Sequence, residues 1–305
     1  MNLENLTTEK ANPASADIDA RPTRQILGII NDEDRKVPEA VAKALDGIAA
    51  LVDDVVAAFG KGGRLFYIGA GTSGRLGVLD ASECPPTYGT DPSMVQGIIA
   101  GGREALVRSI EWAEDKAGEG VRDLEAAGFG ANDVLVGITA SGRAPYVLGA
   151  LERAKALGAV TAGMACNAGA EIFAASKHRI LLEVGPEVVA GSTRMKAGTA
   201  QKLALNMITT ASMIRLGKVY KNLMVDLRPV NEKLVERSKN LVQKATGCGR
   251  EAAEAAFEAS GRKPKIAIIM LLLGVDREAA EALAVKGEGR ISGAIEAAGG
   301  RGAGA

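Results

Sequence analysis

The sequence predicts an α/β protein in which a parallel sheet is sandwiched by helices and followed by a small, all-helical C-terminal module. Between residues 65 and 184, short and almost continuously apolar runs alternate with helical patterns. That alternation is typical of a parallel sheet covered on both faces. From residue 231 onward the pattern is helical and is interrupted by Gly and Pro. We therefore expect a catalytic domain with an N-terminal arm and helix at residues 1–228, and a helical module at residues 229–305.

Each element of the predicted sheet domain has a local signal. Apolar runs bounded by turn residues predict strands at Leu65–Gly69, Met94–Ala100, Val134–Thr139, Val160–Ala165 and Ile180–Val184. Helical spacing predicts the helices between them, at Arg75–Ser82, Arg103–Ala126, Ala144–Leu157 and, shorter, Ala170–Ser176. The pair Pro85-Pro86 is expected to stop the first of these helices.

Further patterns flank the sheet. Residues 1–24 are polar and contain prolines, which predicts an extended arm. Helices are expected before the first strand at Val37–Phe59 and after the last at Lys196–Leu216. The C-terminal helices are expected at Asn231–Ala245, Gly249–Ala259, Pro264–Leu273 and Arg277–Val285. A tail rich in Gly and Ala follows from Gly287 and is expected to be loose at its end.

Composition excludes several classes of function. Lys and Arg together number 37, as do Asp and Glu, so no nucleic-acid partner is expected. The three cysteines lack CxxC spacing and His178 is the single histidine, so we expect neither a zinc site nor a His-dependent triad. The longest apolar run, Ile266–Leu273, is too short to span a bilayer. Together with the polar N-terminus, these features predict a cytoplasmic protein.

A glycine-rich turn with two hydroxyl groups, Gly69–Arg75, follows the first predicted strand. Glycines let backbone N–H groups approach a ligand, and the N-terminus of the next helix attracts anions. Gly71, Thr72 and Ser73 therefore predict a site for a single phosphate group. The alternative is a strand–helix turn that binds nothing.

Two other known anion-binding motifs fit this turn less well. Its glycine spacing also matches the dinucleotide fingerprint, which requires an acidic residue after the second strand to bind a ribose. That strand ends in Gly101-Gly102 instead. The Walker pattern fails as well, because no Lys-Ser or Lys-Thr follows the glycines.

A second turn of the same kind, Gly137–Pro145, follows the third predicted strand. The carboxyl ends of parallel strands meet at one edge of a sheet, so the two turns can close on one phosphate group. Thr139 and Ser141 are the hydroxyl ligands that this arrangement predicts, with ordinary turn chemistry as the alternative.

A third polar segment leads into the long helix and contains Ser192, Thr193 and Lys196. We favour ligand contact for these residues over an ordinary helix N-terminus with flanking charges.

Two glutamates are also candidates for the site: Glu83 near the proline pair, and Glu114 in an acidic patch expected on a helix. Each alone is typical of a solvated surface charge. Two carboxylates beside a phosphate site can instead divide acid and base roles.

Taken together, these segments resemble the N-acetylmuramic acid 6-phosphate etherase family, and the two serine-bearing turns resemble the phosphosugar-binding sugar isomerase (SIS) domain. The resemblance covers about residues 5–295. It rests on Thr8-Glu9 with Asn12-Pro13, Gly69–Arg75, Asp80–Pro86, Ala113–Asp115, Gly137–Tyr146, Ser192–Lys202 and Asn222–Asp226. Two positions depart from the family pattern: Ala11 replaces the usual arginine, and Trp112 replaces a small residue beside Glu114.

The resemblance implies a lyase that cleaves the lactyl ether of N-acetylmuramic acid 6-phosphate, giving N-acetylglucosamine 6-phosphate and D-lactate in cell-wall recycling. A base removes the C2 proton of the open-chain sugar, an acid assists lactate departure from C3, and water then adds. No cofactor or metal is required. The resemblance implies that Glu83 is the acid/base residue, that Glu114 is the second catalytic carboxylate, and that Glu9 and Asn12 contact substrate.

Two other functions use the same fold: an aldose–ketose phosphosugar isomerase, and a non-catalytic phosphosugar sensor like the regulatory protein of glucokinase. Release of lactate separates the etherase from both.

The apolar helices at Val37–Phe59 and Lys196–Leu216 offer more apolar surface than is needed to cover one small sheet. Because SIS proteins are often dimers, we expect a homodimer with its site near the interface, a phosphosugar substrate and no membrane partner.

Overall fold

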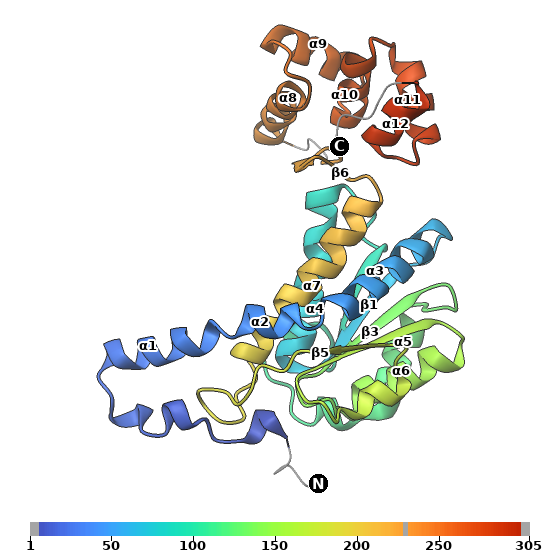
Figure 1. Cartoon of the computed structure of the whole chain (residues 1–305). Helices are drawn as coiled ribbons and strands as arrows, with labels where there is room; N and C mark the ends of the chain where they lie inside the picture. Colours follow the sequence, from blue (N-terminus) through green and yellow to red (C-terminus); the bar gives the residue numbers. More distant parts are fainter. Residues whose placement is uncertain (1–5, 228–230, 300–305) are drawn as a thin grey trace. The chain divides into compact units, whose positions relative to one another are not determined.

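The computed structural model describes residues 6–227 and 231–299, and it confirms the predicted α/β class (Figure 1). Five parallel strands form one sheet in the order β2-β1-β3-β4-β5. Their bounds are β1 Leu65–Gly69, β2 Val95–Ile99, β3 Val134–Ile138, β4 Val160–Ala165 and β5 His178–Leu181. The last strand begins and ends earlier than its apolar run predicts, because it pairs with β4 from His178 to Leu181.

Helices cover both faces of the sheet. On one face α5 (Ala117–Ala126) packs on α6 (Pro145–Ala156), which contacts β1, β3 and β4. On the other face α3 (Leu45–Gly60) contacts β3 and β5. The side chains of β1 alternate accordingly: Phe66 joins the core under α6, whereas Tyr67 points to the helix α4 (Gly71–Tyr88).

Several predicted helix boundaries are wrong. The expected helix Arg103–Ala126 is instead two 3₁₀ turns, Gly102–Leu106 and Ala113–Asp115, followed by α5. Trp112 interrupts it with a left-handed backbone (φ 61°), which a right-handed helix does not accommodate. The expected helix Val37–Phe59 is divided into α2 (Val37–Ala42) and α3.

The proline pair does not stop α4, contrary to the prediction. This helix continues through Pro85 and Pro86 to Tyr88. Proline has no N–H, so the carbonyls of Ala81 and Ser82 lose their helical hydrogen bonds. In this continued part of α4, Cys84 and Tyr88 are buried, with 2% and 9% of their surface exposed. Tertiary packing thus outweighs the local preference for a helix end.

Helical structure flanks the predicted elements at both ends of the described chain. The arm contains three 3₁₀ turns, although an extended chain is expected there, and the helix α1 (Thr23–Asp34) follows it. The Gly- and Ala-rich tail contains the helix α12 (Ile291–Ala297), and the end of the chain, where looseness is expected, lies outside the described residues. The buried Ile291 and Ala294 of α12 belong to a hydrophobic cluster, which explains why a Gly- and Ala-rich segment is helical.

The chain divides into two compact units. The first contains the described residues up to Ser82 together with Pro92–Thr209, and so includes the sheet. The second contains Glu83–Asp91 and the residues from Thr210 onward. The predicted domain boundary between residues 228 and 229 lies outside the described residues and stays a prediction.

The second unit contains a helical module with its own core. A short antiparallel hairpin, β6 (Val219–Tyr220) and β7 (Leu223–Met224), precedes it. The helices are α8 Glu232–Thr246, α9 Arg250–Ala259, α10 Pro264–Leu273, α11 Arg277–Lys286 and α12. Within residues 6–227 and 231–299, no helix combines the length and the apolar character needed to cross a bilayer.

Candidate active site

The first serine-bearing turn joins β1 directly to α4. A Cβ atom at Gly69 would lie 2.8 Å from the Gly74 nitrogen, and one at Gly74 would lie 2.7 Å from the Gly69 oxygen. Gly71 has a left-handed backbone (φ 53°). The glycines therefore let the strand end and the helix start touch. The result places Thr72 and Ser73 in the first turn of a helix that points its N–H groups at the carboxyl edge of the sheet.

The second turn lies beside the first. Gly69 is paired with Ile138 in the sheet, so the turns leave from neighbouring strand ends. Thr139 Oγ1 and Ser141 Oγ are hydrogen-bonded to each other at 3.2 Å. Thr139 is buried, while Ser141 is half-buried and lines a cavity. The structure thus brings Thr72, Ser73, Thr139 and Ser141 to one edge of the sheet.

Asn167 ties the second turn to the N-terminal arm. Its Nδ2 donates to the carbonyl oxygens of Ala140 (3.0 Å) and Ser141 (3.4 Å) and to Thr8 Oγ1 (3.2 Å). Its Oδ1 accepts a hydrogen bond of 2.7 Å from the Thr7 nitrogen. Asn167 is 3% exposed, and its amide group is fully used by these partners.

The arm also contacts the loop between β5 and α7 (Lys196–Arg215). Asn12 is buried, and its Nδ2 donates to the Pro186 carbonyl at 3.0 Å. The Gly191 nitrogen donates to the Thr8 carbonyl at 3.1 Å. The Glu9 carboxyl lies against Gly191, 3.1 Å from the position of a Cβ there. Asn12 therefore shapes the arm, whereas Glu9 remains exposed.

A cavity of about 190 Å³ brings three predicted site residues together. Glu9 reaches it from the arm, Ser141 from the second turn, and Glu114 from the 3₁₀ turn before α5. Its remaining lining residues are Leu6, Asp115, Arg143, Ala144 and Pro145.

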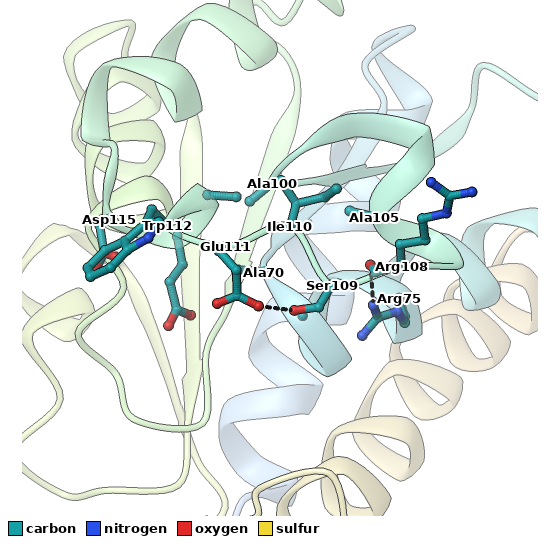
Figure 2. Close-up of a pocket in the computed structure, with 13 residues that line it drawn as sticks. Ala70, Arg75, Ala100, Ala105, Arg108, Ser109, Ile110, Glu111, Trp112 and Asp115 are labelled. Carbon is teal, nitrogen blue, oxygen red and sulfur yellow. Dashed lines mark hydrogen bonds between the residues drawn. The ribbon is translucent and has the colours of Figure 1, made fainter.

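Glu114 also borders a larger cavity of about 360 Å³, which begins at Gly71 of the first turn (Figure 2). Arg75 of α4 shapes its wall, because the guanidinium donates to the carbonyl oxygens of Leu106 (3.2 Å) and Arg108 (2.9 Å). Arg75 and Arg108 lie at one end in Figure 2 and Trp112 and Asp115 at the other, with Glu111 between them. The cavity is therefore basic at one end and acidic at the other.

The pKa of Glu114 is raised above its ordinary value. Burial of part of its carboxyl between the cavity walls is the main cause, and the charge of neighbouring Asp115 acts in the same direction. The residue as a whole remains exposed, so water still reaches it. A raised pKa makes this carboxylate a stronger base and a group that exchanges protons closer to neutral pH.

Lys196 lies at the start of α7 in a buried ionic cluster. Its Nζ is 2.5 Å from Glu33 Oε2, and the two residues are 1% and 3% exposed. The backbone nitrogens of Lys196 and Ala197 donate to the Glu187 carboxylate at 3.0 and 2.9 Å. The ammonium and this helix N-terminus are thus bonded to carboxylates of the same chain.

Ser192 and Thr193 lie in the turn that precedes α7, and both are half-buried. The Thr193 carbonyl accepts a hydrogen bond of 3.0 Å from the Gly198 nitrogen, which starts the helix. In the third polar segment, the hydroxyl groups of these two residues are the ones that we still predict to contact the substrate directly.

Glu83 lies on α4, in the second unit, and is exposed. It directly follows Ala81 and Ser82, whose carbonyls receive no helical N–H because of the proline pair. The other predicted site residues lie in the first unit.

Sequence reasoning missed Asn167 and Gln201 as members of this site. Asn167 is a polar residue just after the apolar run of β4, which is a signal for the carboxyl edge of the sheet. Gln201 is one turn inside α7 and bonds Ser73, which no local pattern indicates.

The sheet and its two serine turns define a SIS-type domain, and a family model of this class matches part of the chain. Residues 47–155 match the family model of the glucokinase regulatory protein N-terminal SIS domain. A solved phosphoheptose isomerase from Francisella tularensis superposes with a TM-score of 0.45 at 17% identity, covering 62% of this chain and 100% of that one.

Whole-chain relatives identify the family. The chain is 55% identical to N-acetylmuramic acid 6-phosphate etherase of Photorhabdus laumondii subsp. laumondii, over 97% of this chain and 99% of the relative. It is 52% identical to the etherase of Geobacillus thermodenitrificans, over 96% of this chain and 100% of the relative. The chain belongs to the N-acetylmuramic acid 6-phosphate etherase family.

Proposed function

We propose that this protein cleaves the D-lactyl ether of N-acetylmuramic acid 6-phosphate, giving N-acetylglucosamine 6-phosphate and D-lactate. The whole-length identity to etherases supports the reaction. The observation that supports the site is the pair of serine turns on neighbouring strand ends, with Glu114 lining the cavities beside both. The cysteines lie apart without CxxC spacing, which favours a cytoplasmic setting.

The phosphate group is bound by the two turns. Gly71, Thr72 and Ser73 at the N-terminus of α4, with Thr139 and Ser141 from the second turn, supply hydroxyl and backbone donors. Hydrogen bonds to a charged group contribute about 1.5–3 kcal/mol each, so these donors suffice without a lysine. Ser192 and Thr193, with Glu9 of the arm, complete the substrate contacts. Lys196 and Asn12 support them from behind, through their bonds to Glu33 and to the Pro186 carbonyl.

The two glutamates divide the proton transfers. Elimination requires that the C2 proton, acidic beside the open-chain aldehyde, leaves while the C3–O bond to lactate breaks. Glu114, with its raised pKa, takes the proton from carbon. Glu83 gives a proton to the departing lactate oxygen. Water then adds to the C2–C3 double bond: its oxygen bonds C3 as it gives a proton to Glu83, and Glu114 returns a proton to C2. The rest of the sugar is unchanged, so the products are an alcohol and a hydroxy acid.

Incubation of the purified protein with N-acetylmuramic acid 6-phosphate is expected to release D-lactate and N-acetylglucosamine 6-phosphate in equal amounts. An enzymatic D-lactate assay measures the first product, and mass spectrometry in H₂¹⁸O locates the added oxygen on the sugar. Conversion of the sugar without lactate would support a phosphosugar isomerase. Tight binding without turnover would support a sensor.

We expect a homodimer whose interface lies near the site. Val107 and Trp112, 82% and 76% exposed, are large apolar side chains on the segment that carries Glu114. Burying these side chains against a second copy would remove apolar surface from water, which favours association. Sedimentation equilibrium is expected to give twice the chain mass, and Trp112→Glu to shift it toward the monomer. A parental monomer with full activity at micromolar concentration contradicts this assembly.

A further inference from the structure

A buried hydrogen-bonded pair joins the first turn of α4 to α7. Ser73 and Gln201 are 7% and 1% exposed, and Ser73 Oγ donates to Gln201 Oε1 at 2.9 Å. The amide nitrogen Nε2 of Gln201 is buried and has no hydrogen-bond partner within residues 6–227 and 231–299. A buried donor without an acceptor is energetically costly and calls for a specific reason.

The direction of this hydrogen bond conflicts with phosphate binding. A phosphate dianion can only accept hydrogen bonds, so Ser73 must offer it the hydroxyl hydrogen. Serine has one such hydrogen, and in this structure Gln201 Oε1 receives it. Binding at Ser73 therefore requires that the bond between these two side chains reverses.

We propose that Gln201 is a positioning residue for the substrate phosphate and that its amide group reverses on binding. After a 180° rotation of the amide, Nε2 donates to Ser73 Oγ and the Ser73 hydroxyl turns its hydrogen to a phosphate oxygen. The oxygen and the NH₂ group of an amide are nearly equal in size, so the rotation needs no repacking. It gives the buried nitrogen its missing acceptor and the phosphate a donor. The inference rests on the phosphate position in the proposed function.

Packing around the pair allows this rotation without movement of the helices. Thr72 lies close to α7, because a Cβ atom at Gly198 would be 3.3 Å from Thr72 Cγ2. Gly198 and Gln201 are three residues apart and share one face of α7. The backbone near Gln201 is therefore held against α4, and the amide group is the part that adapts. A donating neighbour also polarises the Ser73 hydroxyl toward its acceptor.

Two substitutions separate this role from simple packing. Gln201→Glu supplies a carboxylate that only accepts, so it retains the Ser73 hydrogen and repels the phosphate. Gln201→Met has a similar length without hydrogen bonds. Calorimetry with N-acetylglucosamine 6-phosphate is expected to show binding about 10-fold weaker for Met and at least about 100-fold weaker for Glu than for the parent chain. Unphosphorylated N-acetylglucosamine is expected to show no such difference.

The pH dependence provides a second readout. Protonation of the carboxylate introduced by Gln201→Glu would make that side chain a donor again. The dissociation constant of Gln201→Glu divided by that of Gln201→Met is therefore expected to fall as the pH is lowered from 7 to 5. Using the ratio cancels the titration of the phosphate itself. Equal affinities of the Glu and Met variants at pH 7, or parental affinity of the Met variant, overturn the inference.

Ser73→Ala distinguishes this inference from the phosphate position on which it rests. If Ser73→Ala weakens binding by about 10- to 100-fold and the Gln201 variants match the parent, the turn binds phosphate and the role of Gln201 is wrong. If Ser73→Ala binds as the parent does, the phosphate position is wrong and the inference falls with it. Circular dichroism and urea unfolding confirm that each variant is folded before it is compared.

Discussion

Replacing Glu83 by glutamine is expected to slow D-lactate release by at least about 100-fold while substrate binding persists. Positioned acid–base catalysis contributes about 10²–10⁴ in rate. Glutamine keeps the shape and hydrogen-bonding capacity of the side chain but cannot give a proton to the lactate oxygen. The loss is therefore expected in kcat, with KM close to that of the parent.

The measurement compares three variants under saturating substrate. Glu114→Gln is expected to slow turnover as well, since it removes the proposed base. Glu152→Gln is the control: Glu152 is exposed on α6 and has no role in the proposal, so its rate should be parental. A folded Glu83→Gln protein that binds substrate and turns over at the parental rate would move the acid role elsewhere, with Glu114 the first candidate.

Replacing Glu33 by glutamine is expected to destabilise the protein by about 3–5 kcal/mol, the usual cost of removing one partner of a buried ion pair. Glu33 bonds Lys196 and Lys36, both at 2.5 Å. Without its charge, the Lys196 ammonium stays 1% exposed with a neutral partner. Glu125→Gln is the matched control, because Glu125 pairs with Arg153 at 2.8 Å where both side chains are about half exposed. We expect it to cost less than about 1 kcal/mol.

The pH dependence of this effect has a definite sign. Burial opposes ionisation of Glu33, but hydrogen bonds from Lys196, Lys36 and Asn12 outweigh it and lower the pKa to about 2. A carboxyl whose folded pKa lies below its unfolded value stabilises the protein above the unfolded value, 4.5 here. The stability difference between parent and Glu33→Gln is therefore expected to shrink as pH falls from 4.5 toward 2. Urea unfolding across this range measures it, and a constant difference would show that the ion pair is not its source.

Two helical segments of the structure differ from what their local sequence patterns predict. Pro85 and Pro86 normally end a helix, yet α4 continues through them, where the neighbouring Cys84 and Tyr88 are buried. The apolar spacing over residues 103–126 indicates one helix, yet Trp112 is left-handed and divides it. In the first case burial of side chains outweighs the backbone preference of proline. In the second the structure shows the left-handed residue, which ends a right-handed helix, but the local pattern does not indicate it.

The sequence alone determined the parallel sheet, the helical C-terminal module, the two serine turns and the family. These properties depend on periodicity, on glycine spacing and on ordered motifs, all of which are readable within short windows of the chain. The local glycine pattern even accounts for the contact between the end of β1 and the start of α4.

Only the tertiary structure decided which side chains meet. Ser73 bonds Gln201 across 128 residues, Asn167 bonds Thr8 across 159, and Lys196 bonds Glu33 across 163. Periodicity shows which face of an element is buried, but it contains no information about the partner that covers a given side chain. Thus Lys196, which is predicted to contact substrate, lies in an internal ion pair, and Gln201, which no local pattern indicates, bonds the first serine turn. Such pairings are determined by how the helices and strands pack against one another, because packing brings together side chains that are far apart in the sequence.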